Sequence, residues 1–418
     1  MQLTDAAILV TGKAGTGKST LLRNFVAGTG KKCVVLAPTG IAAINAGGQT
    51  IHSFFGFPVR PLVYKDEEIK KFSKHHPKSK IMQQMDTLII DEVSMIRADI
   101  MDAIDHALRI NLNKPYKPFA GKQIVLFGDV FQLEPVVQNN PVEQSLFNEF
   151  YRSHYFFDAR VFSECILTGL ELEKVYRQTD PVFIGLLDKI RTNTMDESSL
   201  NLLNQRYMLD YEPSIDEFVI TLCTRNVTAE NINDFMLSQL ESPVFEYKGT
   251  IEGDFSDRNL PTSYNLQLKV GAQVVFIKNH VGGKYVNGTI GKIESLAEDV
   301  VEVLLSDGST IELTQETWEN RSYSFNNQNK KIVTEIKGRF TQFPIRLAWA
   351  MTIHKSQGLT FDKAIIDLGY GTFAHGQLYV ALSRCRSLEG IYLRQKIKNS
   401  DIIVDDRVVN FAKQNVLI

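Results

Sequence analysis

The sequence lacks the features that mark several large protein classes. Its four cysteines, Cys33, Cys165, Cys223 and Cys385, are far apart and form no Cys-x-x-Cys pair, which argues against a zinc site and favours a reduced intracellular protein. No apolar run approaches the roughly 18 residues of a membrane span, and no signal-peptide pattern opens the chain. The formal net charge is only -2, which argues against a histone-like binder but leaves room for a basic groove. We therefore expect a cytoplasmic protein without a membrane partner.

The 418 residues exceed what one hydrophobic core usually supports, so we expect two or three domains. Over residues 1–168, short apolar runs closed by proline or an acid alternate with helical patterns, which predicts an α/β domain with a parallel sheet. Residues 169–269 and 343–418 carry a second set of this kind. Residues 270–342 contain short β runs joined by turn residues, which predicts a small all-β module inserted in the second domain. Residues 52–80 interrupt the first domain.

The clearest motif is GKAGTGKST at residues 12–20, which follows an apolar strand and opens a helix. Its glycines let backbone N–H groups surround phosphates, and Lys18 reaches the β- and γ-phosphate oxygens. Ser19 is placed for Mg²⁺. We expect ATP to bind here, through Gly12, Ala14, Gly15, Thr16, Gly17, Lys18, Ser19 and Thr20.

The stretch LIIDEVSM (88–95) places two acids directly after a strand, where ligands of open α/β sheets bind. We expect Asp91 to hold Mg²⁺ through water and Glu92 to polarise the attacking water. Adjacent acids also occur in solvated turns, and a two-metal nuclease would need further clustered acids. In LFGDVFQLEPV (126–136), Gln132 is a candidate γ-phosphate sensor. Asp129 either joins that network or caps a helix.

Two arginines stand in mostly apolar surroundings, Arg177 in VYRQTD and Arg384 in YVALSRCRS. A buried arginine is costly unless it is paired, so each either forms a structural salt bridge or has a ligand. We expect both to act as arginine fingers in cis, which touch the γ-phosphate when an interdomain cleft closes.

The motifs in this order resemble the petite-integration-frequency (Pif) helicases of superfamily one. The matching stretches run from residue 12 to about 394: GKAGTGKST, APTGIAAINAGGQTIHSFF, IIDEVSMI, LFGDVFQLEPV, VYRQTD, AWAMTIHKSQGLTF and YVALSRCRS. MIRADIMDAIDHALR resembles the signature helix of that family. In one departure, family members carry an upstream glutamine that reads adenine, whereas here Gln2 lies too close to the P-loop for the helix that would hold it.

The resemblance implies two RecA-like domains, with a wedge subdomain at 52–80 and a Src-homology-three-like β-barrel at 270–342. It implies a bacterial-type enzyme of the cytosol or nucleoid that moves 5′-to-3′ on single-stranded DNA as a monomer. Forked duplexes and G-quadruplexes are the expected substrates. In TIHKSQGLTF, whose residues 352–357 we expect to end a helix over 346–357, Gln357 and Gly358 would face the γ-phosphate.

The resemblance also implies that two segments hold DNA. We call PTGIAAINAGGQTIHSFFGF the first grip and TIHKSQGLTF the second grip. Phosphates are held by short donors and backbone N–H groups, and aromatic side chains can stack on bases. The expected DNA contacts are Thr39, Gly40, Thr50, His52, Ser53, Phe54, Asp129, Thr352, His354, Lys355 and Ser356. Phe55 and Phe57 are further candidates for stacking, although consecutive aromatics more often belong to a core.

Other functions fit parts of the same pattern. A DNA-stimulated ATPase that remodels nucleoprotein without separating strands needs the same motifs. A P-loop signalling switch needs neither the two grips nor the two arginines. An RNA substrate is also open, because backbone tracking and stacking discriminate weakly against 2′-hydroxyls.

Overall fold

The computed structural model describes residues 7–417, except for 59, 138–140, 215–216, 258–259, 281 and 327–330. The chain divides into two compact units. The first unit contains Met1–Val175, Glu319–Gly338 and Asp406–Ile418, and the second contains Tyr176–Trp318 and Arg339–Asp405. Gln2 lies outside the described residues.

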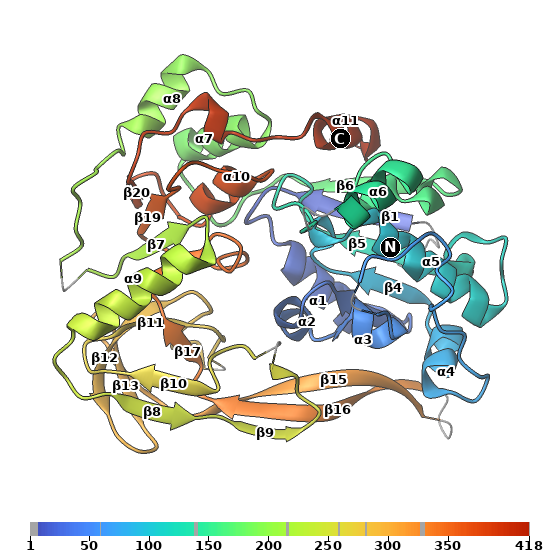
Figure 1. The fold of residues 1–418 in the computed structure, drawn as a ribbon, viewed down its shortest axis with the longest axis horizontal. Coiled ribbons are helices and arrows are strands. Elements are labelled where there is room, and N and C mark those ends of the chain that lie inside the picture. The colour runs from blue at the N-terminus through green and yellow to red at the C-terminus, as the bar shows by residue number, and fades with distance from the viewer. Residues whose placement is uncertain are drawn as a thin grey trace. The chain divides into compact units, whose positions relative to one another are not determined.

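The first unit is built on a parallel sheet with the strand order β21-β6-β1-β5-β4-β2-β3 (Figure 1). Its central strands are short apolar runs buried on both faces, as parallel strands covered by helices require. The strands are β1 (Ala7–Gly12), β2 (Cys33–Ala37), β3 (Gln49–Thr50), β4 (Thr87–Ile90), β5 (Gln123–Phe127), β6 (Leu167–Leu172) and β21 (Val416–Leu417). The helices are α1 (Lys18–Gly28), α2 (Gly40–Ala46), α3 (Ile51–Phe55), α4 (Pro77–Gln84), α5 (Ala98–Leu112), α6 (Pro141–Phe150) and α11 (Asp406–Asn415), with 3₁₀ turns η1 (Val93–Met95), η2 (Pro118–Gly121), η3 (Phe156–Asp158) and η4 (Arg160–Ser163).

The strand order positions the motifs of this unit. Strand β5 lies between β1 and β4, with Ile8 opposite Val125 and Ile89 also opposite Val125. Because the three strands are parallel, their carboxyl ends meet at one edge of the sheet. The P-loop follows β1, the acid pair follows β4, and Gly128 follows β5 at this edge.

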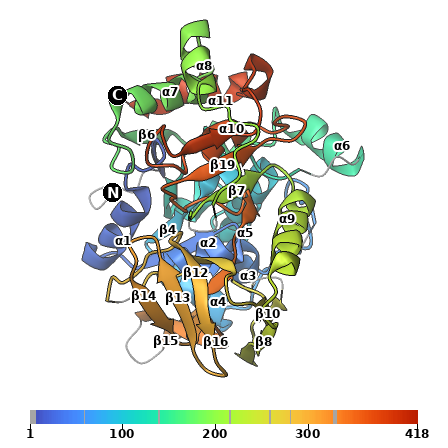
Figure 2. The same ribbon diagram turned by 90° about the vertical axis from the view of Figure 1, so that its left-hand side faces the viewer.

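The second unit contains a smaller parallel sheet with the order β18-β7-β19-β20. Helix α9 packs against β18 and β7, and α10 packs against α7. Figure 2 shows α9 beside β7. The elements are α7 (Pro181–Arg191), α8 (Glu197–Asn204), β7 (Ile220–Cys223), α9 (Asn226–Gln239), β18 (Ala350–Thr352), β19 (Ala364–Asp367), α10 (Gln377–Leu382), β20 (Ile391–Leu393) and η6 (Asn399–Asp401).

The rest of the second unit is mainly antiparallel β structure. Five strands form a sheet in the order β14-β13-β12-β11-β17, over a core that includes Phe276, Val303 and Phe343. These strands are β11 (Gln273–Phe276), β12 (Ile290–Leu296), β13 (Val301–Leu305), β14 (Thr310–Leu313) and β17 (Ile345–Leu347). The others are β8 (Phe245–Lys248), β9 (Thr250–Gly253) and β10 (Asn265–Leu268). Strands β15 (Glu316–Asn326) and β16 (Lys331–Gln342) begin and end in this unit, but their Glu319–Gly338 part belongs to the first unit.

The expected helix over 346–357 is wrong. Strand β17 pairs with β11, and β18 pairs with β7, with Ala350 opposite Thr221. The backbone hydrogen bonds that join this segment to β7 include one from Thr221 N to Trp349 O at 2.8 Å. A short apolar run does not reveal by its periodicity whether it is a buried strand or a helix, and here the neighbouring strands decide.

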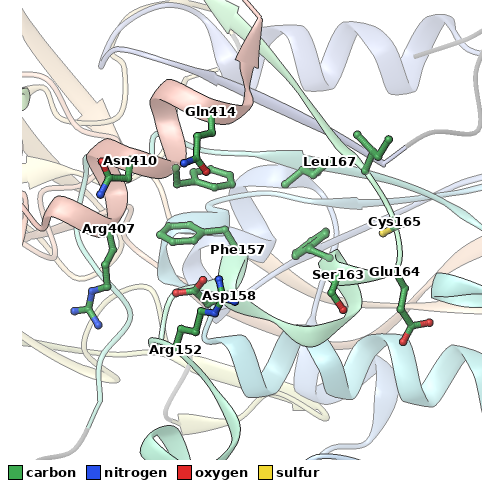
Figure 3. Close-up of a pocket in the computed structure, with 13 residues that line it drawn as sticks. Arg152, Phe157, Asp158, Ser163, Glu164, Cys165, Leu167, Arg407, Asn410 and Gln414 are labelled. Carbon is green, nitrogen blue, oxygen red and sulfur yellow. The ribbon is translucent and has the colours of Figure 1, made fainter.

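The chain enters the first unit three times, which differs from the expected grouping of 343–418 in the second domain. Strand β21 extends the sheet beside β6, with Val416 opposite Gly169. Helix α11 places Phe411 on Phe157, with ring centroids 4.2 Å apart. A pocket of about 690 Å³ lies beside this stack, where Figure 3 shows Phe157 near Arg407, Asn410 and Gln414. None of the expected site residues lines it.

The stretch between α3 and α4 contains turns and no strand among its described residues, which exclude Val59. Asp66 organises these turns from a buried position. Its carboxylate pairs with the Arg60 guanidinium through bonds of 2.7 and 2.9 Å and accepts from the N–H groups of Val63 and Glu68. Among the described residues, no helix is long and apolar enough to cross a membrane.

Candidate nucleotide and DNA sites

The P-loop backbone adopts conformations that favour glycine. Gly12, Gly15 and Gly17 have φ angles of 142°, 81° and 85°. A Cβ atom on Gly12 would lie 2.5 Å from Leu172 O on β6, so that position also needs glycine for space. Lys18, the first residue of α1, donates from Nζ to Gly12 O at 2.6 Å and to Lys13 O at 2.9 Å. Ser19 and Thr20 are exposed beside it.

The acid pair lies at the end of β4 as expected from the sequence. Burial raises the pKa of the Asp91 carboxyl, while the Glu92 N–H, which donates to it at 3.0 Å, and the Lys18 ammonium favour its ionised form. The electrostatic effect of Lys18 on Asp91 places the P-loop lysine and the acid pair at one site. Glu92 has φ 51° and ψ 46°, a left-handed conformation that is uncommon for a residue with a Cβ atom and is concentrated at functional sites.

Two buried hydroxyls adjoin these motifs, Thr11 Oγ1 before the P-loop and Ser94 Oγ after the acid pair. Neither has a hydrogen-bond partner among the described residues. A buried polar atom without a partner commonly marks a bound ligand, ion or water. The sheet edge therefore has unused hydrogen-bonding capacity, which fits a phosphate-bearing ligand with a hydrated metal ion.

Asp129 and Gln132 follow β5 at the same edge. Asp129 is 1% exposed and accepts from the Phe131 N–H at 3.2 Å, while its own carbonyl accepts from Gln132 N. In this conformation the Asp129 carboxylate stabilises a buried turn, and the expected DNA contact from Asp129 stays a prediction. Gln132 is also largely buried.

In the first expected DNA grip, the hydroxyls mainly shape the backbone. Thr39 and Thr50 cap α2 and α3, accepting from Ala42 N and Ser53 N. Ser53 is exposed, and its Oγ accepts from Gln49 Nε2 at 2.7 Å. Gly40 begins α2. Burial lowers the pKa of His52, so its imidazole is neutral near pH 7 and would act as a hydrogen-bonding group.

Phe54, which we expect to stack on bases, is buried in this structure, and its contact with DNA stays a prediction. Phe54 and Phe55 are each 1% exposed and Phe57 is 5% exposed. Phe54 packs edge-on against Phe55 at 4.8 Å, and Phe55 stacks on Phe57 at 5.1 Å. These consecutive aromatics form a small core beneath the grip.

In the second expected grip, TIHKSQGLTF, the side chains divide between interior and surface. Thr352 and Ser356 are buried, and their hydroxyls bond to Lys355 N and Ile353 O. The expected DNA contacts from these two residues stay predictions. Lys355 is exposed, and His354 and Gln357 are half-buried. Gly358 is exposed with φ 83°.

The two arginines meet at Ser383 within the second unit. Arg177 Nη1 donates to Ser383 O at 3.1 Å, and Arg384 Nη2 donates to Ser383 Oγ at 2.9 Å. Arg384 is 1% exposed and also donates to the carbonyls of Val380, Ser356 and Leu359. Arg384 thus connects the end of α10 to the TIHKSQG turn.

Sequence reasoning missed three residues that support these sites. Gln178 is buried and donates to the carbonyls of Ser383 and Cys385. Its position directly after Arg177 in VYRQTD could have marked it as a residue that supports this arginine. Gln49 lies within the first grip but was not among its expected contacts, and Tyr323 contacts this grip from a distant part of the chain. Tyr323 follows Gln49 by 274 residues, so no local pattern pointed to it.

A P-loop and an acid pair at the same edge of one parallel sheet, in a chain with two RecA-like parallel sheets, define an α/β ATPase. The sequence pattern of the PIF1-like helicase family matches residues 1–198. The ATP-dependent DNA helicase Pif1 of Bdellovibrio bacteriovorus is 30% identical over 97% of this chain and 88% of its own length. PIF1 of Danio rerio is 33% identical over 100% of this chain, which spans 61% of that relative.

Solved structures of Bacteroides sp. Pif1 match the whole fold. The complex with ADP-AlF4 has a TM-score of 0.91 and 41% identity, covering 98% of this chain and 93% of that one. The same relative bound to single-stranded DNA has a TM-score of 0.69 at 42% identity, with the same coverage. The chain therefore belongs to the Pif1-like helicases, and it is an ATP-hydrolysing DNA helicase.

Proposed function

We propose that this chain moves 5′-to-3′ on single-stranded DNA and unwinds forked duplexes and G-quadruplexes, acting as a monomer. The proposal takes the first unit as the first RecA-like domain, with its wedge at 52–80, and the parallel sheet of the second unit as the second RecA-like domain. The expected bounds of 1–168 and of 169–269 with 343–418 shift accordingly, and the inserted β-barrel within 270–342 keeps strands β11 to β14. The ATP-driven cycle alternately tightens and releases the two grips on the DNA.

One observation carries the proposal, the connection between Arg384 and the TIHKSQG turn. Arg384 Nη1 lies 3.5 Å from Ser356 O and 3.4 Å from Leu359 O, the carbonyls of the turn expected to hold DNA. If Arg384 is drawn toward a γ-phosphate, these bonds must break or the turn must move with it. A change at the nucleotide is thereby transmitted to the DNA grip, which is what a translocating ATPase requires.

The residues of the first unit would hold ATP and Mg²⁺. Lys18 and the P-loop N–H groups would bind the phosphates, while Ser19 and Asp91 would hold the ion, which neutralises developing phosphate charge. Glu92 would orient and deprotonate the attacking water, and Gln132 would contact the γ-phosphate. Arg177 and Arg384, with Gln357 and Gly358, would approach it from the second unit.

Relatives support the choice of substrate. Two Bacteroides Pif1 structures are bound to single-stranded DNA, and a further Pif1 structure is described as DNA unwinding at forked double-stranded DNA by two coordinating Pif1 helicases. The second description concerns that relative and bears on our proposal of a monomer. Sedimentation of this chain on a forked substrate, at a range of protein concentrations, would decide between one and two copies.

The test of function compares two matched duplexes, one with a 5′ single-stranded tail and one with a 3′ tail. With ATP and Mg²⁺, we expect only the 5′-tailed duplex to open, and Lys18→Ala to open neither. Opening of the 3′-tailed duplex alone would overturn the proposed direction. ATPase activity stimulated by single-stranded DNA, with neither duplex opened, would instead favour an ATPase that remodels nucleoprotein.

A further inference from the structure

A hairpin segment reaches the first unit from a distant part of the sequence. Residues 319–338, in strands β15 and β16 (Figure 1), group with the first unit although the chain on both sides belongs to the second. Tyr323 lies against strand β2. Its hydroxyl accepts from Val35 N at 2.9 Å and donates to Val35 O at 3.3 Å. Strand β3 pairs with β2 only at Leu36 and Ala37, so the tyrosine continues the hydrogen bonding of β2 where β3 is absent.

The same tyrosine also contacts the first DNA grip. Its ring packs edge-on against Phe54 of α3, with centroids 6.2 Å apart and an interplanar angle of 84°. Its backbone N–H points to Gln49 Oε1 at 3.4 Å, and Gln49 Nε2 donates to Ser53 Oγ at 2.7 Å. A chain of contacts therefore runs from the hairpin through Gln49 to Ser53, which is a candidate ligand of DNA phosphate.

The chemistry of Tyr323 favours a fixed contact. Burial raises the pKa of its phenol, so the hydroxyl keeps its proton and can donate and accept together. Helix α3 has five residues, too few to be stable by itself, and it depends on its neighbours for its orientation. Phe54, which is buried between Phe55 and Tyr323, is the side chain through which the hairpin fixes this helix.

We propose that Tyr323 is a positioning residue for DNA, which holds α3 and Ser53 in the geometry that grips the phosphate backbone. The inference rests on the proposed function, because it needs single-stranded DNA as the ligand of the first grip. The hairpin is then a part of the DNA site that acts through Gln49 and Phe54, without touching the nucleic acid itself.

The test uses the full chain and measures the concentration of single-stranded DNA that gives half-maximal ATPase stimulation. Tyr323→Phe keeps the ring on Phe54 and loses both bonds to Val35, so we expect this concentration to rise roughly threefold to tenfold. Tyr323→Ala loses the ring as well, and the rise should be roughly tenfold or more. The KM for ATP and the DNA-free ATPase rate should stay unchanged. Tyr116→Phe, at an exposed tyrosine of the same unit, is the matched control.

The possible results separate this inference from the proposed function. If DNA fails to stimulate the unaltered chain, the proposed function is wrong and the inference with it. If the unaltered chain is stimulated and both variants keep its half-maximal concentration, the role of Tyr323 alone is wrong. Tighter DNA binding in Tyr323→Phe would also overturn it, since the hairpin would then oppose the grip. Loss of the DNA-free ATPase rate in Tyr323→Phe would also overturn the inference, because Tyr323 would then support the fold of the whole unit and not the DNA grip in particular.

Discussion

At the scale of single residues, Glu92 combines a proposed role in ATP hydrolysis with a strained backbone. We expect Glu92→Gln to lower kcat for ATP roughly 10²- to 10⁴-fold, because an amide cannot take a proton from water, while nucleotide affinity stays nearly unchanged. Steady-state ATPase rates and titration with a fluorescent ATP analogue would check both. The exposed helical residue Glu149 offers a control, and Glu149→Gln should leave both values alone. An unaffected kcat in Glu92→Gln would remove Glu92 from the reaction.

The left-handed φ of 51° at Glu92 gives a separate prediction about stability. Glycine adopts this region without strain, so Glu92→Gly should raise the free energy of unfolding by roughly 1 kcal/mol while abolishing hydrolysis. Thermal unfolding of the two proteins would show the change. A lower melting temperature for Glu92→Gly would mean that contacts of the Glu92 side chain outweigh the backbone strain.

Of the two arginines, Arg177 allows the cleaner test of an arginine finger. Arg384 is buried, and Arg384→Ala would leave carbonyls at Ser356 and Leu359 without a donor, so lost activity would be mixed with lost stability. Arg177 is only half-buried, and we expect Arg177→Ala to fold normally and to lose roughly 10³-fold in DNA-stimulated kcat. Arg386→Ala, at a side chain that is 60% exposed, is the control. Unchanged turnover in Arg177→Ala would exclude that arginine from catalysis.

At the scale of elements, the turns between α3 and α4 depend on the carboxylate of Asp66. The Arg60 guanidinium holds the pKa of Asp66 below its ordinary value, so the ionised form stabilises the folded state. This contribution is complete above the unfolded pKa of about 4 and is lost as the pH falls through the lower folded pKa. Asp66→Asn should therefore lower the unfolding free energy by about 1–3 kcal/mol at pH 7 and by less near pH 3.

Denaturant unfolding of Asp66→Asn and the unaltered chain at both pH values would test this. Hydrogen exchange of the Val63 and Glu68 N–H groups should also become faster in the variant. The exposed neighbour Glu67 provides a control, since Glu67→Gln should change neither quantity. A difference in unfolding free energy that grows toward low pH would contradict the assigned direction of the pKa shift.

Local sequence patterns were sufficient to predict those elements that depend only on residues close together in the chain. The P-loop, the acid pair and most strands of both parallel sheets could be placed, because glycine spacing and buried apolar runs are visible in the chain. Strand β18 was missed, since its three residues become a strand only beside β7. Burial of Phe54, Asp129 and Ser356 could not be predicted either, because each packs against or bonds to groups that only the folded backbone brings close.

At the scale of the whole molecule, the first unit is completed by two segments from the second half of the chain. Glu319–Gly338 brings Tyr323 to β2, and Asp406–Ile418 brings α11 and β21 to the sheet. Neither return has a local signature, so the sequence suggested a simpler order of domains. The consequence is that the nucleotide-binding unit is not encoded by its contiguous N-terminal residues alone.

The aromatic stack of Phe411 on Phe157 provides the test of that consequence. Phe411 is 9% exposed in α11, and its ring lies 4.2 Å from that of Phe157 and 5.9 Å from that of Phe156. Truncation of a buried phenylalanine costs about 3–5 kcal/mol, so Phe411→Ala should lower the unfolding free energy by roughly 3 kcal/mol. Because α11 packs on the unit that carries the P-loop, saturating ATP should restore part of the lost thermal stability.

Phe235→Ala, at a side chain that is 62% exposed in the second unit, is the control and should change the unfolding free energy by less than about 0.5 kcal/mol. Equal effects of the two substitutions would show that α11 adds little to the first unit, and the N-terminal 175 residues would then be expected to fold without it.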